Sequence, residues 1–204
     1  MARKTKAKMA KKVAPKRGAA RPKARARAKP KRVTPIPEYL HAVTPNLVFK
    51  DSVAAIAFYA KAFGAKELSR MPTPDGKGTW HAEIRIGDSV IFMNDESPMN
   101  PIKAASAERP ATSTLHLYVK DCDATIARAV EAGATISMPA ADMFWGDRMG
   151  GIVDPFGIPW GIATRRAKLT PSQLKKAGED FARKLEPVAY PHEAGSEEYG
   201  PGAD

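Results

Sequence analysis

The sequence predicts an α+β fold in which two βαβββ modules pair into a cupped mixed sheet, and three observations lead to it. Residues 47–57 and 117–127 repeat one pattern, an apolar strand, a Lys-Asp pair and an apolar helix start, seventy residues apart. Each copy is followed by a Gly-Ala pair, Gly64-Ala65 and Gly133-Ala134, where a helix should end and a strand begin. The same order of strand and helix patterns follows in both copies. Two such modules closing on each other leave a cleft, the usual place for a ligand.

The first module is predicted over residues 42–95. Residues 44–49 form a short strand, and Asp51-Ser52 provide the N-cap of a helix that ends at the left-handed Gly64. Apolar side chains recur along this helix at helical spacing, at Val53, Ile56, Ala57, Ala60 and Phe63. A second strand begins over 67–70, residues 72–76 form a turn, and residues 79–86 alternate between an apolar and a polar face. Gly87-Asp88 turns the chain into a strand over 89–93.

The second module is predicted over residues 113–166, after a linker at 96–112. It has a strand at 114–119, a helix at 124–132 and a strand at 135–138. A hairpin of residues 149–153 and 160–164 follows, closed by Asp154-Pro155-Phe156-Gly157, where Pro and Gly suit a type I turn. Thr170-Pro171 caps a polar helix over 170–186, and the Gly-, Pro- and Glu-rich segment 187–204 is expected to be flexible.

The amino-terminal segment, residues 1–37, has a different composition from the rest of the chain. It contains fifteen Lys and Arg residues and no Asp or Glu, whereas the remainder has 18 basic and 22 acidic residues. The net charge of +11 therefore comes from this tail. The tail has no apolar periodicity, so we expect it to be disordered. Its charges predict binding to DNA, RNA or another polyanion without sequence preference, and the alternative is a solubilising arm.

Composition excludes several classes of protein. The single cysteine, Cys122, allows no intrachain disulfide, which favours a reducing cytoplasm. No apolar run reaches the ~18 residues of a membrane span, and no secretory signal is present at the start, so no membrane partner is expected. Cys122 lies at a predicted helix start, which predicts a lowered thiol pKa. The alternative is that it is a small buried residue without reactivity.

Two groups of residues resemble a known family. Asp142-Met143-Phe144-Trp145-Gly146-Asp147-Arg148, followed by Asp154-Pro155-Phe156-Gly157 and Trp160, is similar to a signature of the PhnB-like branch of the vicinal oxygen chelate superfamily. Phe58-Tyr59 and Ala62-Phe63-Gly64-Ala65 at the end of the first helix resemble it as well. The superfamily includes glyoxalase I, bleomycin-resistance proteins and extradiol dioxygenases. The resemblance covers about residues 42–166 and implies this fold, a small-molecule ligand and a homodimer.

The same resemblance makes a metal centre at the family's usual site unexpected. Metal-dependent members carry His, Glu or Gln at four points, which correspond here to Thr44, Phe92, Thr114 and Gly161. None of these is a good ligand for zinc, nickel, manganese or iron. The branch also often carries His after the Asp-Pro-Phe-Gly turn, where this chain has Ile158. We therefore expect no metal and no cofactor there, while a displaced metal site at His81, Glu83 and His116 remains an alternative.

Strand alternation predicts where a ligand pocket should lie. His81, Glu83 and Arg85 share the polar face of one strand, and Thr114, His116 and Tyr118 share a face of the equivalent strand region. With Phe144 and Trp145 on a loop at the mouth, the expected pocket comprises His81, Glu83, Arg85, Phe92, Thr114, His116, Tyr118, Phe144 and Trp145. Alternation assigns Trp80 and Trp160 to the core. Asp147 and Arg148 are expected to form an ion pair that holds the loop.

Three functional hypotheses follow, and no catalytic residue is assigned. The first is a small-molecule-binding protein without metal at the usual site. The second is a lyase, isomerase or dioxygenase of the glyoxalase type with a rearranged site, in which a histidine oriented by Glu83 acts as general acid or base. The third is a nucleic-acid-associated protein whose tail sets its location and whose domain senses a ligand. The polar face is also consistent with a solvated groove that has no chemical role.

Overall fold

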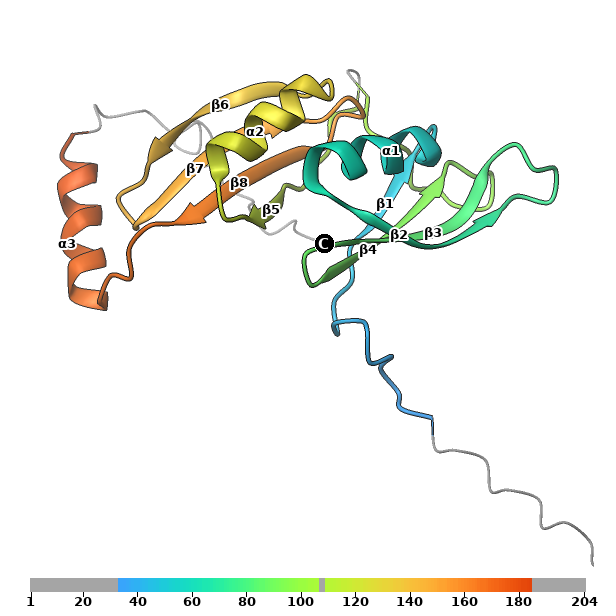
Figure 1. The fold of residues 1–204 in the computed structure, drawn as a ribbon, viewed down its shortest axis with the longest axis horizontal. Helices are drawn as coiled ribbons and strands as arrows, with labels where there is room; N and C mark the ends of the chain where they lie inside the picture. The colour runs from blue at the N-terminus through green and yellow to red at the C-terminus, as the bar shows by residue number, and fades with distance from the viewer. Residues whose placement is uncertain (1–32, 107–108, 185–204) are drawn as a thin grey trace, which may run out of the picture. The chain divides into compact units, whose positions relative to one another are not determined.

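The computed structural model describes residues 33–106 and 109–184 (Figure 1). The first module consists of β1 (Asn46–Phe49), α1 (Ser52–Phe63), β2 (Lys66–Pro72), β3 (Thr79–Ile86) and β4 (Ser89–Asp95). The second consists of β5 (Leu115–Tyr118), α2 (Cys122–Glu131), β6 (Thr135–Asp142), β7 (Asp147–Val153) and β8 (Pro159–Arg165), and α3 (Pro171–Ala182) follows. The predicted pair of βαβββ modules is confirmed. Most of the basic tail and the segment 187–204 lie outside the described residues.

Each module forms a four-stranded mixed sheet, and the two sheets have equivalent strand orders. The first has the order β1-β4-β3-β2 and the second β5-β8-β7-β6. In each, the first strand of the module runs parallel to the last, and the other pairs are antiparallel. Asn46 pairs with Phe92 in β1 and β4, and His116 pairs with Gly161 in β5 and β8. The sequence repeat therefore marks structurally equivalent strands.

The aspartate of the repeated Lys-Asp pair caps the helix of each module. Asp51 and Asp121 are the N-caps of α1 and α2, and each accepts a hydrogen bond from the backbone N–H three residues on, at 2.9 Å. Gly64 ends α1 at φ 69°, a left-handed conformation that glycine adopts without strain. Thr170 and Gln173 form a capping box at the start of α3. Local sequence thus sets where these helices begin.

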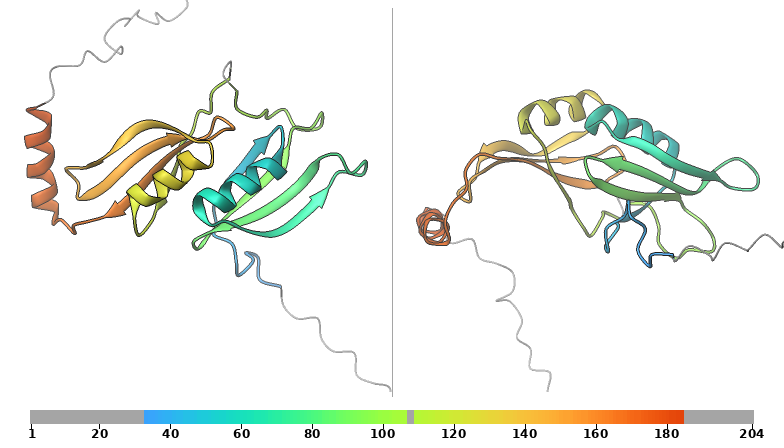
Figure 2. Two further views of the ribbon diagram at one scale, coloured as in Figure 1. Left: turned by 45° about the horizontal axis from the view of Figure 1, so that its top comes forward. Right: turned by 60° about the horizontal axis from the view of Figure 1, so that its bottom comes forward.

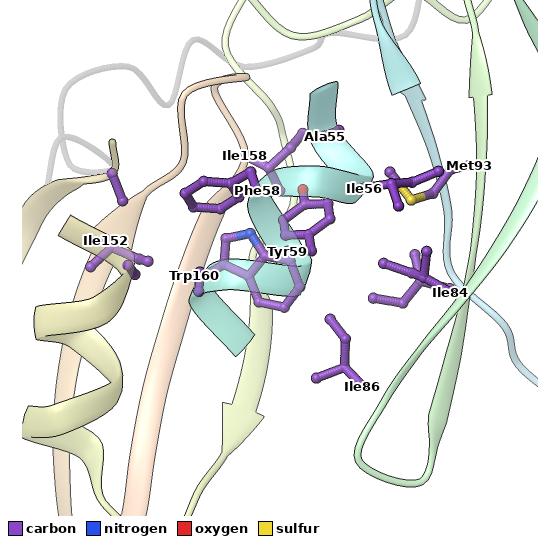
Figure 3. Packing of buried hydrophobic residues seen from close by; sticks show 14 of the residues in the cluster. Ala55, Ile56, Phe58, Tyr59, Ile84, Ile86, Met93, Ile152, Ile158 and Trp160 are labelled. Carbon is purple, nitrogen blue, oxygen red and sulfur yellow. The ribbon is translucent and has the colours of Figure 1, made fainter. Parts of the chain in front are cut away.

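The hydrophobic core is continuous across both modules. α1 and α2 lie on the same side of their sheets and contact each other, leaving the opposite faces of the sheets without a helix (Figures 1 and 2). Tyr59 of α1 packs against Trp160 of β8 with ring centroids 5.4 Å apart (Figure 3). Phe63 of α1 also packs against Trp160, with centroids 4.7 Å apart. The Tyr59 hydroxyl also donates a 2.7 Å hydrogen bond to buried Asp154 in the β7–β8 turn. The two modules are therefore joined by aromatic packing and by a buried polar contact.

This junction changes which face of α1 is buried. The predicted apolar stripe is only partly right, because Val53, Ala57 and Ala60 are exposed. Ile56 is buried as predicted, and the other buried residues of the helix are Ser52, Ala55, Phe58, Tyr59 and Ala62. α1 packs on its own sheet and also on the second module, so its buried face is turned toward Tyr59 and Trp160.

The prediction that Trp80 belongs to the core is wrong, because 48% of Trp80 is exposed. On β2 the pairing steps from Met71 to Pro72, while on β3 it steps from His81 to Thr79. Trp80 is thus the extra residue of a β-bulge, which reverses the alternation at this end of the strand. Thr79 is buried in its place. Trp160, by contrast, lies in the core as predicted.

Across residues 33–106 and 109–184, no helix combines the length and the apolar character needed to cross a membrane.

Candidate functional site

The candidate site lies on the sheet faces that α1 and α2 leave uncovered, which we call the open faces. Ala82 and Ile84 of β3 are fully buried on the helix side, so His81, Glu83 and Arg85 lie on the open face of the first sheet. The cross-strand partners of Glu83 and Arg85 share this face, and they include Phe92 of β4 and Lys66 of β2. In the second sheet, His116 and Tyr118 alternate with the inward Leu115 and Leu117.

His81 and Glu83 form a polar pair on the first open face. The His81 Nε2 atom lies 3.3 Å from Glu83 Oε1, and the His81 ring packs edge-on against Phe92 with centroids 4.9 Å apart. The Glu83 side chain is only 14% exposed, whereas that of His81 is 40% exposed. Tyr39, from the segment before β1, places its hydroxyl 3.5 Å from the same Glu83 oxygen. Glu83 therefore orients His81, and the imidazole is accessible to a small molecule.

Two cations lie next to each other on the same open face. Lys66 and Arg85 are direct cross-strand partners, an arrangement in which like charges repel. Neither has an ion-pair partner among the described residues. The pair adds a local positive charge to the face that carries His81. Sequence alternation along β3 indicated Arg85, but Lys66 became apparent only from the strand register.

On the second open face, two side chains converge on Asp147. Tyr118 Oη donates to Asp147 Oδ2 at 2.8 Å, and Trp145 Nε1 donates to the same oxygen at 3.1 Å. The hydrogen bond to Asp147 raises the pKa of Tyr118. His116 packs beside Tyr118, with ring centroids 5.0 Å apart.

The predicted ion pair between Asp147 and Arg148 is wrong. Adjacent residues of a strand point to opposite faces, so Arg148 lies on the helix side. There it bonds Asp123 at the start of α2 and Asp142 at the end of β6. Arg148 in turn lowers the pKa of Asp123 through its hydrogen bonds. The loop before β7 is therefore held by Asp147 through the two aromatic side chains, and Arg148 fixes α2 to its sheet.

The expectation of a lowered thiol pKa at Cys122 is also wrong. Cys122 is fully buried at the first turn of α2, and its Sγ lies 3.1 Å from the Ile162 carbonyl oxygen, to which it donates. Burial raises the pKa of the thiol. The structure favours the alternative, a small buried residue, over a reactive nucleophile.

The four positions that correspond to the family's metal ligands do not fit a metal centre. Thr44 and Thr114 offer only hydroxyl groups, and the Thr44 hydroxyl is bonded to the His41 carbonyl at 3.3 Å. Phe92 and Gly161 supply no donor atom. A Cβ atom on Gly161 would lie 2.8 Å from His116 Nδ1, so the imidazole occupies the space of any side chain there. Among the described residues, no three His, Cys, Asp or Glu side chains gather in a way that would hold a metal ion.

The residues of the predicted pocket lie on two open faces, one in each module. His116 lines a cavity of about 260 Å³ between the modules, together with His41, Val43, Val90 and Trp160. His81 and Glu83 are not part of its lining. Thr114 is exposed just before β5, and Phe144 stacks on Phe181 of α3 with centroids 4.9 Å apart. Sequence reasoning missed Asp147 as the shared acceptor and the segment before β1 as part of the site.

Comparisons with known proteins agree with this architecture. Residues 39–162 match the model of the Glyoxalase/Bleomycin resistance protein/Dioxygenase superfamily. An uncharacterized protein from Mycobacterium bovis is 38% identical over 143 residues, which cover 67% of this chain and 91% of that protein. The crystal structure of an Arabidopsis thaliana gene product aligns with a TM-score of 0.51 and 28% identity, covering 61% of this chain and 98% of that one. A PhnB protein from Bacillus cereus aligns with a TM-score of 0.48 and 16% identity, covering 61% and 99%. Because the family model matches more than half of its residues, the chain is a member of the Glyoxalase/Bleomycin resistance protein/Dioxygenase superfamily.

Proposed function

We propose that this protein binds a small organic molecule on its open faces and does so without a metal at the family's usual positions. The observation that carries the proposal is the His81–Glu83 pair, an accessible imidazole held by a largely buried carboxyl group. When Glu83 accepts from Nε2–H, the Nδ1 atom of His81 is left as an acceptor for a donor on the ligand. The pair thus provides an oriented polar contact on an open surface.

The neighbouring cations define the chemical character of the ligand. Lys66 and Arg85 repel each other across the ladder and have no ion-pair partner in the described part of the chain. An anionic group on the ligand would relieve this repulsion, and a guanidinium binds carboxylate or phosphate in a bidentate geometry. We therefore expect a ligand that carries a carboxylate or phosphate group.

Binding without metal chemistry rests on the donor set. Thr44, Phe92, Thr114 and Gly161 provide neither imidazole nor carboxylate, which zinc, nickel, manganese and iron sites require. The rival function is an enzyme of the glyoxalase type with a displaced metal at His81, Glu83 and His116. In the single chain, His81 and Glu83 lie on the first sheet and His116 on the second. The displaced metal site therefore requires His116 to approach His81 and Glu83.

A homodimer is part of the proposal. Each open face exposes large side chains, Met71 and Trp80 on the first module and Tyr118 and Trp145 on the second. The open face of one copy placed against that of another would enclose the ligand and cover these side chains. Light scattering and native mass spectrometry of the purified full-length protein measure this state directly.

Native mass spectrometry of protein purified without chelator tests ligand and metal together. The wild-type protein should retain an organic mass and no stoichiometric metal. His81→Ala and Arg85→Gln should each release that mass, whereas Lys61→Ala, an exposed charge change on α1, should not. Stoichiometric metal that is lost in His81→Ala would instead establish the enzyme with the displaced site. A retained mass unaffected by both site variants would contradict binding at this face.

The basic tail supports a second function, polyanion binding through residues 1–37. The described end of this segment, residues 33–37, is exposed, and the whole segment carries fifteen positive charges without one acidic residue. Such a segment neutralises phosphates without reading bases. This property would localise the ligand-binding domain on nucleic acid, and it is tested by removing the tail.

A further inference from the structure

A row of aromatic side chains crosses the second open face. Tyr118 lies on β5, and its hydroxyl reaches Asp147 on β7, so its side chain spans the intervening strand β8. The residue opposite Tyr118 on β8 is Ala163, whose small side chain lets the ring lie across the strand. Even so, 60% of Tyr118 is exposed. One side of the ring therefore rests on the sheet and the other is available to solvent.

Trp145 extends this row from the β6–β7 turn. Its indole N–H donates to the same Asp147 oxygen, and 37% of the residue is exposed. Phe144 packs edge-on against Trp145 with centroids 5.0 Å apart, and Phe144 stacks in turn on Phe181 of α3. Trp145 is thus held by a hydrogen bond on one side and by aromatic packing on another.

Asp147 is the residue that connects the two exposed rings. It is only 6% exposed, and a single oxygen accepts from both Tyr118 and Trp145. Large exposed aromatic side chains normally lose rotamer entropy when they bind a partner. A ring that is already fixed loses less, so its binding costs less free energy. A buried carboxyl group that fixes two exposed rings is a costly feature for a surface without a binding role.

We infer that Tyr118 and Trp145 form a preorganised stacking surface for a planar aromatic ligand or ligand group, and that Asp147 is its positioning residue. This inference rests on the proposed function and specifies the ligand that the second module would take. Aromatic groups stack on such rings through dispersion and quadrupole interactions, which a saturated ring of the same size does not match. The surface should therefore distinguish planar from puckered molecules.

The test uses 2-naphthol as probe and decahydro-2-naphthol as its saturated control. Binding to the full-length protein is followed by the indole N–H signals of its three tryptophans in ¹H–¹⁵N NMR spectra. The signal of Trp145 should shift on adding 2-naphthol, and the saturated control should bind more weakly. Trp145→Leu should weaken 2-naphthol binding about tenfold. Val53→Ala trims an exposed apolar side chain of α1, on the helix side of the sheets, and should leave binding unchanged.

Two further variants separate positioning from contact. Tyr118→Phe keeps the ring and removes its anchor, and it should weaken binding about fivefold because the ring must be ordered on binding. Asp147→Asn should weaken binding to a similar degree and shift the Trp145 indole signal in the free protein, while the signal of buried Trp160 stays in place and reports an intact fold.

The inference is overturned if 2-naphthol binding is absent, if it is unchanged in Trp145→Leu and Tyr118→Phe, or if the saturated control binds equally well. These results are distinct from a failure of the proposed function. A retained ligand that depends on His81 and Arg85 would then still establish small-molecule binding on the first sheet.

Discussion

The hydrogen bond between Tyr59 and Asp154 should be a major contributor to the stability of the two-module domain. Tyr59 is fully buried in α1, and Asp154, in the turn of the other module, is 4% exposed. Asp154 accepts from the Tyr59 hydroxyl and the Trp160 indole through one oxygen, and from the backbone of Phe156 and Ile158 through the other. Tyr59→Phe removes one of these four donors and leaves the ring packing intact.

The expected loss follows from the environment of the bond. A hydrogen bond to a charged group contributes about 1.5–3 kcal/mol, and burial leaves no water to replace the missing donor. Tyr59→Phe should therefore lower the free energy of unfolding by about 2 kcal/mol. With a urea m value of about 2 kcal/mol/M, the unfolding midpoint should fall by about 1 M.

Urea unfolding followed by tryptophan fluorescence measures this change, because Trp160 lies at the same site. Tyr39→Phe is the matched control, since it removes a hydroxyl from an exposed tyrosine whose hydrogen bond to Glu83 is 3.5 Å long. The control should change stability by less than about 0.5 kcal/mol. If Tyr59→Phe costs no more than Tyr39→Phe, the buried contact does not join the modules as we describe.

The pH dependence provides a second check of the same contact. Burial, followed by the charge and hydrogen bond of Asp154, raises the pKa of Tyr59 above its ordinary value of 10.0. The folded protein therefore keeps Tyr59 protonated when the unfolded chain already releases that proton. The contribution of the protonated Tyr59 hydroxyl to the free energy of unfolding is complete below about pH 10 and is lost as the pH rises further. The stability difference between wild type and Tyr59→Phe should narrow above about pH 10.

Three further predictions concern other parts of the chain. Arg148→Gln should lower the thermal midpoint slightly. Because Arg148 lowers the pKa of Asp123, this difference from wild type should disappear as the pH falls below about 4, and a difference that persists at about pH 2 would contradict the pairing. Gly150→Ala should cost about 2 kcal/mol in urea unfolding, because its Cβ would lie 2.5 Å from a core isoleucine and 3.1 Å from backbone. Gly161→Ala should cost less, because its nearest contacts are ends of flexible side chains, and equal costs would contradict this account. If about ten charges of residues 1–37 contact phosphates, the logarithm of DNA affinity should fall with the logarithm of salt at a slope of about −9. Deleting 1–37 should abolish binding without changing the unfolding midpoint, and unchanged affinity would refute a role for the tail.

The sequence by itself determined the modules and the face on which the first half of the site lies. The seventy-residue repeat marks equivalent strands and equivalent N-caps, because capping and strand alternation depend on neighbouring residues. His81, Glu83 and Arg85 share an open face for the same reason. Strand alternation gives the wrong face for Trp80, because a β-bulge inserts one residue there. No local pattern in the sequence predicts this bulge.

Only the tertiary structure decided which side chains interact across strands and between modules. The sequence predicts Arg148 as the partner of Asp147, but the partners in the structure are Tyr118, twenty-nine residues away, and Trp145. Lys66 lies next to Arg85 because of the register between β2 and β3. The buried face of α1 is directed toward Trp160 because the second module packs there. Hydrogen-bond partners and buried faces depend on distances that the folded chain creates. A sequence pattern gives the direction of a side chain along its own strand or helix, but the group that it meets comes from another element.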